Sequence, residues 1–62
     1  MKEELRNALK NIQIEKMMTK NALESYRKMS LITGLEYERE INALLDKLLI
    51  LDKLEKEIRK KM

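Results

Sequence analysis

Apolar residues recur along the second half of the chain in steps that mostly alternate between four and three residues, with one irregularity around Leu54. The members of this stripe are Tyr37, Ile41, Leu44, Leu48, Leu51, Leu54, Ile58 and Met62. This spacing places side chains on one side of an α-helix and is close to the 3.5-residue repeat of coiled coils and helical bundles. The pattern therefore predicts a long amphipathic helix that packs against another helix.

The first half of the chain carries a matching stripe with a polar middle. Its apolar members are Leu5, Leu9, Ile12, Leu23 and Tyr26, and Ala8, Ala22 and Met29 broaden it. Between them Glu15, Lys16 and Thr19 occupy core-side positions. One interpretation is a buried polar layer that fixes the register of the helices. In the other, which we favour, Glu15 and Lys16 extend from the edge of the stripe and Thr19 bonds back to its own helix.

The connection between the stripes contains two alternative helix-end signals. Thr33 and Glu36 fit a capping box that starts the second helix, with Ile32 and Tyr37 placed as a hydrophobic staple. Alternatively Gly34, the only glycine, is the left-handed residue that closes the first helix. Either way the connection is short, and a short connection makes two helices antiparallel neighbours.

We therefore predict an all-α fold, an antiparallel helical hairpin with two long helices in one domain over residues 1–62. The first helix is expected at about residues 2–30, the turn at about 30–35 and the second helix at about 35–62. Folding back about this turn pairs Tyr26 with Tyr37.

Both helices carry more apolar surface than one seam uses. The second helix is apolar nearly all round between Leu48 and Leu51, which is typical of a helix with neighbours on several sides. We expect a homodimer in which two hairpins form a four-helix bundle, or a larger protein that covers the same surface. The residues expected at this second interface are Ile14, Met17, Met18, Leu45, Leu49 and Ile50.

Composition argues against catalysis and against a membrane span. The chain has no Cys and no His, so thiolate chemistry, the commonest metal ligand and the usual general base are missing. No catalytic motif is present, and we expect no enzyme activity, cofactor or metal. The longest apolar run, from Leu48 to Leu51, is far shorter than the roughly 20 residues of a membrane helix. We expect a cytoplasmic protein.

The net charge of +3 is concentrated in the first half, where residues 1–29 carry seven basic and four acidic groups. A basic face there offers a second hypothesis, in which the hairpin binds RNA or DNA through phosphate contacts. The residues of this face are Lys2, Arg6, Lys10, Lys20 and Arg27. Both tyrosines fall on the apolar stripes rather than on this face, so no aromatic ring is placed to stack on bases. We favour a solvated basic face over a nucleic-acid site.

The span from Leu23 to Ile50 also resembles, loosely, the sporulation-regulating aspartyl-phosphate phosphatases of bacilli. These are short two-helix proteins with a glycine-containing turn and a Ser-Gln-Glu-Leu-Asp signature on the second helix. The matching segments are Leu23-Glu24 and Arg27-Lys28-Met29 on the first helix, Gly34-Leu35 in the turn, and Leu45-Asp46-Lys47-Leu48 at the end of the signature. The signature's first three positions are Asn42, Ala43 and Leu44 here, and the spacing from Gly34 to Asp46 is two residues short. The resemblance implies a phosphatase-like regulator with Asp46 as the residue carried over.

The function predicted first is a small non-enzymatic regulatory or adaptor protein. It is expected to act through helical protein–protein contacts, as a homodimer.

Overall fold

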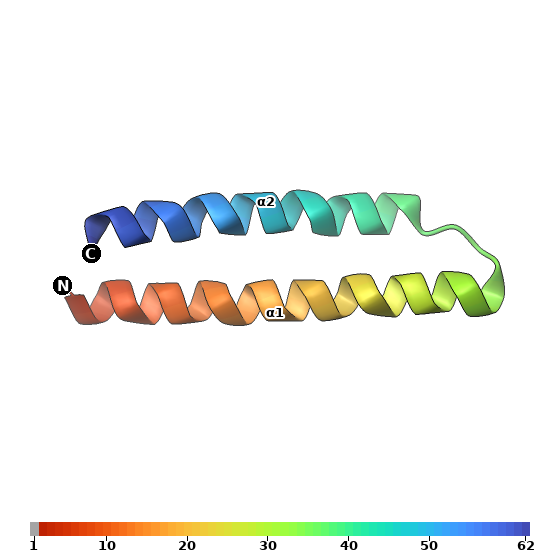
Figure 1. The fold of residues 1–62 in the computed structure, drawn as a ribbon, viewed down its shortest axis with the longest axis horizontal. Coiled ribbons are helices and arrows are strands. Elements are labelled where there is room, and N and C mark those ends of the chain that lie inside the picture. The colour runs from red at the N-terminus through yellow and green to blue at the C-terminus, as the bar shows by residue number, and fades with distance from the viewer. Residues whose placement is uncertain (1) are drawn as a thin grey trace.

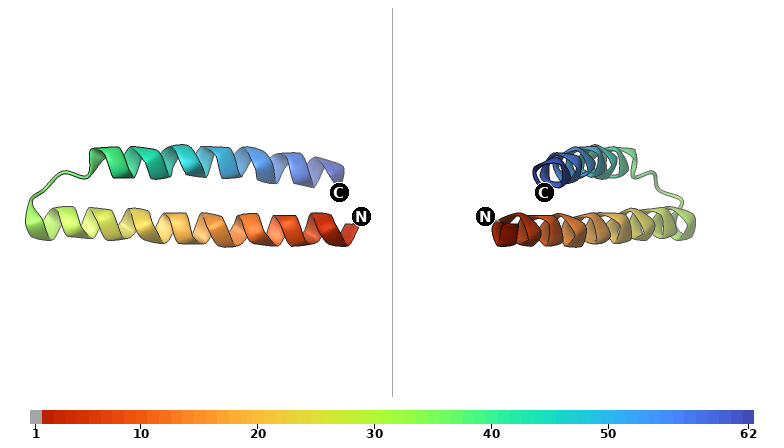
Figure 2. Two further views of the ribbon diagram at one scale, coloured as in Figure 1. Left: turned by 180° about the vertical axis from the view of Figure 1, so that it is seen from behind. Right: turned by 60° about the vertical axis from the view of Figure 1, so that its left-hand side comes forward.

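The computed structural model describes residues 2–62 as two helices joined by a four-residue connection. Helix α1 spans Lys2–Thr33 and has 32 residues, and helix α2 spans Glu38–Lys61 and has 24. The helices run antiparallel along an elongated body of 48 × 15 × 10 Å, with both termini at the same end (Figures 1 and 2). The predicted antiparallel helical hairpin is confirmed.

Helix α1 ends at a glycine, as the second interpretation of the connection predicts. Gly34 has a φ of +75°, a left-handed conformation that costs glycine little because it has no Cβ. Its N–H donates to the Ser30 carbonyl oxygen at 2.9 Å, which satisfies one of the carbonyls left free at a helix end. The helix therefore continues about three residues beyond its predicted end, and α2 begins at Glu38 rather than near residue 35.

The predicted capping box at the start of α2 is wrong. Thr33 is the last helical residue of α1, and its hydroxyl donates to the Met29 carbonyl at 2.8 Å. The same hydroxyl accepts the Leu35 N–H at 3.2 Å. Thr33 is thus committed to ending α1, and the N-cap of α2 is Tyr37, which makes no side-chain capping bond.

The last turn of α1 projects past the start of α2 (Figure 1). Leu31 and Ile32 at this tip are 87% and 84% exposed, so the predicted staple between Ile32 and Tyr37 does not form. Tyr37 instead packs on Tyr26, with ring centroids 5.4 Å apart. This contact confirms the predicted pairing of the two tyrosines and fixes the register at the turn end of the hairpin.

The seam between the helices buries few side chains. Leu23 and Thr19 of α1 and Leu51 of α2 are the buried residues of the described chain. The Thr19 hydroxyl donates to the Glu15 carbonyl at 2.7 Å, as predicted. This bond lets a polar residue sit in the seam without an unsatisfied group.

Leu54 is not part of the seam, in contrast to the prediction. It is 47% exposed, and the partly buried Glu55 takes the position next to α1. The physical reason is the helical period, because the step of four from Leu51 to Glu55 keeps the 3.5-residue repeat that a step of three to Leu54 would break.

Candidate interaction surface

All six residues predicted at a second interface are exposed in the hairpin. They are Ile14, Met17, Met18, Leu45, Leu49 and Ile50, with exposed fractions between 40% and 64%. Leu54 and Met29 are also large apolar side chains on the surface. Sequence reasoning missed these two because it assigned both to the seam. The irregular spacing around Leu54 was the signal that could have predicted its exposure.

Ion pairs cross the seam on both sides of its polar middle. The Lys16 ammonium lies 2.6 Å from the Asp52 carboxylate, and the Glu15 carboxylate lies 3.1 Å from the Lys47 ammonium. Glu15 and Lys16 are consecutive, so their side chains leave α1 about 100° apart and emerge on either side of the buried Thr19. The two residues do lie at the edges of the seam, but they are bound to the opposite helix rather than extended freely into solvent.

The Glu15–Lys47 pair marks one face of the hairpin, which we call the Met18 face. Residues three, four or seven positions apart share a helix face. On α1, Met18 lies three positions from Glu15, and Ile14 lies four from Met18. On α2, Ile50 and Leu54 lie three and seven positions from Lys47. The large apolar side chains of this face are Ile14, Met18, Met29, Ile50 and Leu54. The Met18 face therefore carries large exposed apolar side chains from both helices, and near its centre one acid and one base neutralise each other.

The Lys16–Asp52 pair marks the opposite face, which we call the Lys16 face. Leu45 and Leu49 lie on it because they precede Asp52 by seven and three residues. The bond from Lys16 lowers the pKa of Asp52, and the charges of Lys20 and Lys56 lower it further, against the opposing effect of desolvation. The Lys16–Asp52 pair therefore lies in a charged part of the surface, beside two exposed leucines.

The Lys16 ammonium is shared between two carboxylates of α2. Besides Asp52 it reaches Glu55 at 3.4 Å, and Glu55 also lies 3.8 Å from Arg59. The bond to Asp52 is the main cause that raises the pKa of Lys16, with a smaller contribution from Glu55 and an opposing one from desolvation. The Lys16 side chain is four-fifths buried. Together with Asp52 and Glu55 it covers the seam between the helices on the Lys16 face.

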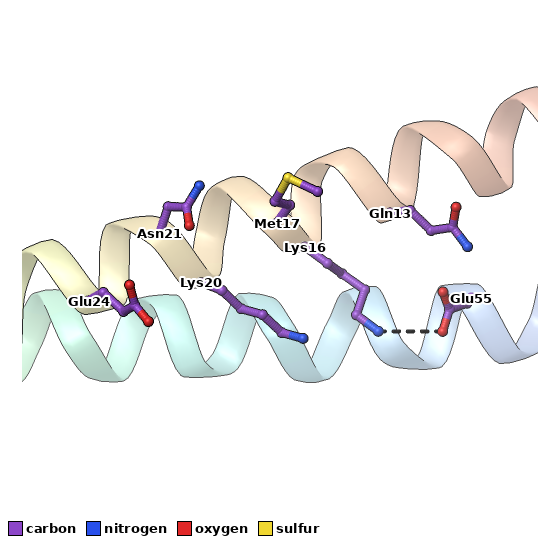
Figure 3. A pocket seen from close by; sticks show the side chains of 7 residues that line it. All are labelled: Gln13, Lys16, Met17, Lys20, Asn21, Glu24 and Glu55. Carbon is purple, nitrogen blue, oxygen red and sulfur yellow. Dashed lines mark hydrogen bonds and ion pairs between the residues drawn. The ribbon is translucent and has the colours of Figure 1, made fainter.

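A shallow groove of about 460 Å³ runs along α1 beside this cluster. Figure 3 shows the Lys16 side chain crossing to Glu55, with Lys20 extending beside it toward α2. The lining residues are Gln13, Lys16, Met17, Lys20, Asn21, Glu24 and Glu55. Six of the seven lining residues are polar or charged, and both signs of charge are present. Met17 belongs to this groove and so lies apart from its neighbour Met18.

The five residues of the predicted basic face are all exposed. Arg6, Lys20 and Arg27 are separated by multiples of seven and therefore share one row of α1, and Lys2 and Lys10 lie one turn to either side of Arg6. Lys20 is close enough to Asp52 to influence its pKa. The positive charge of this row is thus partly balanced where it passes the middle of the hairpin.

Other features bear on the alternatives. Asp46, the residue that the phosphatase resemblance singles out, is exposed. Within residues 2–62 no three His, Cys, Asp or Glu side chains are grouped so as to hold a metal ion. Neither α1 nor α2 combines the length and the apolar character that crossing a membrane requires. Comparison of the chain with protein-family models, with curated proteins and with solved structures found no match.

Proposed function

We propose that this chain is a small non-enzymatic regulatory or adaptor protein of the cytoplasm. It acts through helical protein–protein contacts and forms a homodimer in which two hairpins make a four-helix bundle. The observation that carries this proposal is the surplus of exposed apolar side chains on both helices, set against three buried residues among residues 2–62. Apolar side chains gathered on the surface of a small protein mark interaction sites.

The surface area of the hairpin supports a partner of substantial size. The chain exposes 5353 Å², whereas a compact monomer of 7.5 kDa exposes about 4,200 Å². The surplus of about 1,100 Å² exceeds the roughly 800 Å² that each partner buries in a standard interface. Burial of this area in a dimer would bring the exposed surface of each chain to the value expected of a compact 7.5 kDa monomer.

Sedimentation velocity and a quantitative pull-down test the two parts of this proposal. Sedimentation should give twice the 7.5 kDa mass of the chain. A tagged wild-type hairpin should retain a macromolecular partner from its host more strongly than a Leu49→Glu variant, because the charge removes an exposed apolar contact. A wild-type chain that sediments as a folded monomer and binds no partner would contradict the proposal.

Nucleic-acid binding is the second candidate, supported by the shared row of Arg6, Lys20 and Arg27. Binding led by phosphate contacts would weaken steeply with salt. We place it second because Asp52, Glu24 and Glu55 lie beside Lys20. A gel-shift assay with duplex RNA and DNA at low salt tests this candidate, and absence of retention would remove it.

A further inference from the structure

We propose that the Met18 face is the surface through which two copies of this chain associate, and that the Lys16 face stays outside the dimer. This inference rests on the proposed homodimer and adds which surface forms it. The six predicted interface residues thereby divide into two groups. Ile14, Met18 and Ile50 belong to the copy–copy contact, and the remaining residues stay available to a further partner.

Charge is the first reason for this assignment. A two-fold dimer places the same surface on both sides of the interface, so a face must be complementary to itself. The Met18 face meets this condition at its centre, because Glu15 and Lys47 neutralise each other at 3.1 Å. Opposed copies can also exchange these partners, the acid of one chain meeting the base of the other.

The Lys16 face is less suited to a copy–copy contact. Lys16 is bound there to Asp52 at 2.6 Å and to Glu55 at 3.4 Å, within a network that carries both signs of charge. Joining two copies through this face would take that network out of water, which costs free energy that the attraction between the charges need not return. Its two exposed leucines, Leu45 and Leu49, therefore remain available to a different partner.

The distribution of apolar side chains is the second reason. On the Met18 face they come from both helices, with Met18 and Met29 on α1 and Ile50 and Leu54 on α2, each at least 41% exposed. On the Lys16 side α2 presents the exposed leucines, and α1 presents Met17 among lysine, glutamine and glutamate side chains. A four-helix core requires apolar groups from both helices of each hairpin, and the Met18 face supplies more of them.

The chain offers two matched pairs of neighbours that test the assignment. Ile50 and Leu49 are 59% and 61% exposed, and Met18 and Met17 are 60% and 64% exposed, yet the members of each pair lie on different sides. Met18→Glu and Ile50→Glu should each raise the dimer dissociation constant by roughly tenfold or more, as charges in the centre of an interface do. Met17→Glu and Leu49→Glu should leave it nearly unchanged. Sedimentation over a concentration series measures the constant, and far-UV circular dichroism checks that each variant is helical.

A second measurement leaves the interface intact. The chain has no cysteine, so Met18→Cys, Met17→Cys, Ile50→Cys and Leu49→Cys each carry one thiol, whose reaction with a maleimide can be timed. In the dimer the thiols at positions 18 and 50 should react several-fold more slowly than those at 17 and 49. Dilution below the dissociation constant should abolish the difference.

The possible results separate this inference from the proposed function. A wild-type dimer that is weakened equally by all four glutamate variants, or only by those at positions 17 and 49, would overturn the assignment while the homodimer stands. A folded wild-type monomer would overturn both. The assignment would be supported if only the glutamate variants at positions 18 and 50 weaken the dimer, and if only the thiols at these two positions are protected in it.

Discussion

Replacing Leu23 by Ala tests whether the seam is the core that holds the hairpin together. Leu23 is 6% exposed, so the substitution removes three carbon atoms from a buried site. At about 0.8 kcal/mol for each buried carbon, the lost transfer free energy is about 2.4 kcal/mol per chain. Neighbouring side chains at the edge of a two-helix seam can move into the space, so we expect little additional cost from a cavity. The higher helix propensity of Ala offsets a few tenths of a kcal/mol.

Urea unfolding followed by far-UV circular dichroism measures this loss, with wild type and variant at equal chain concentration. The matched control is Leu31→Ala in the same helix, because Leu31 is 87% exposed. Surface substitutions of this kind change stability by about 0.5 kcal/mol or less. If Leu23→Ala cost no more than Leu31→Ala, the seam would not be the core and the packing described above would be wrong.

Three further predictions concern the turn, the cross-helix cluster and the tyrosine pair. Gly34→Ala should destabilise the hairpin by about 1–2 kcal/mol, because a side chain is strained at a φ of +75° although the space beside it is open, and Gly34→Asn should cost less; chemical denaturation compares the two. Lys16 holds the pKa of Asp52 below its ordinary value of 3.8, so the stability contributed by this pair is present above that pH and is lost as the pH falls through the folded-state pKa. The pKa of Lys16 is raised, so its contribution to stability is present below pH 10.5 and is lost as the pH rises through the folded-state pKa. Asp52→Asn should therefore flatten the loss of stability at acid pH and reduce the loss at alkaline pH. A double-mutant cycle on Tyr26 and Tyr37, with each ring replaced by Leu, should give a coupling of about 0.5–1.5 kcal/mol in unfolding experiments; a coupling near zero would argue against the observed ring contact.

The hairpin was predictable because its signals extend over many residues. The 3.5-residue repeat persists through both halves of the chain, and one error in it does not change the helix assignment. The pairing of Tyr26 with Tyr37 followed from the short connection alone, and the structure confirms it.

The helix ends were less predictable because two local motifs competed for the same residues. Thr33 suits an N-cap, but its hydroxyl also bonds back to Met29 when it ends a helix. Gly34 decides between these roles, since it adopts the left-handed conformation that closes α1. The sequence does not decide which of the two motifs forms, because each motif is consistent with these residues.

The candidate surface was predictable as a set of exposed residues but not as two faces. The sequence pattern indicated apolar side chains outside the seam. Their division depends on the phase of each helix, and on α2 this phase follows the unbroken repeat that places Glu55 rather than Leu54 at the seam. The cross-helix ion pairs of Glu15 and Lys16, which locate the two faces, depend on the three-dimensional register and required the structure.

The mass of the wild-type chain in solution tests the central claim most directly. Sedimentation equilibrium at micromolar concentration should give twice the 7.5 kDa mass of one chain, with the helical circular dichroism of an intact hairpin. A helical chain that sediments as a single 7.5 kDa species over the same range would contradict the claim that a second copy covers the exposed apolar surface.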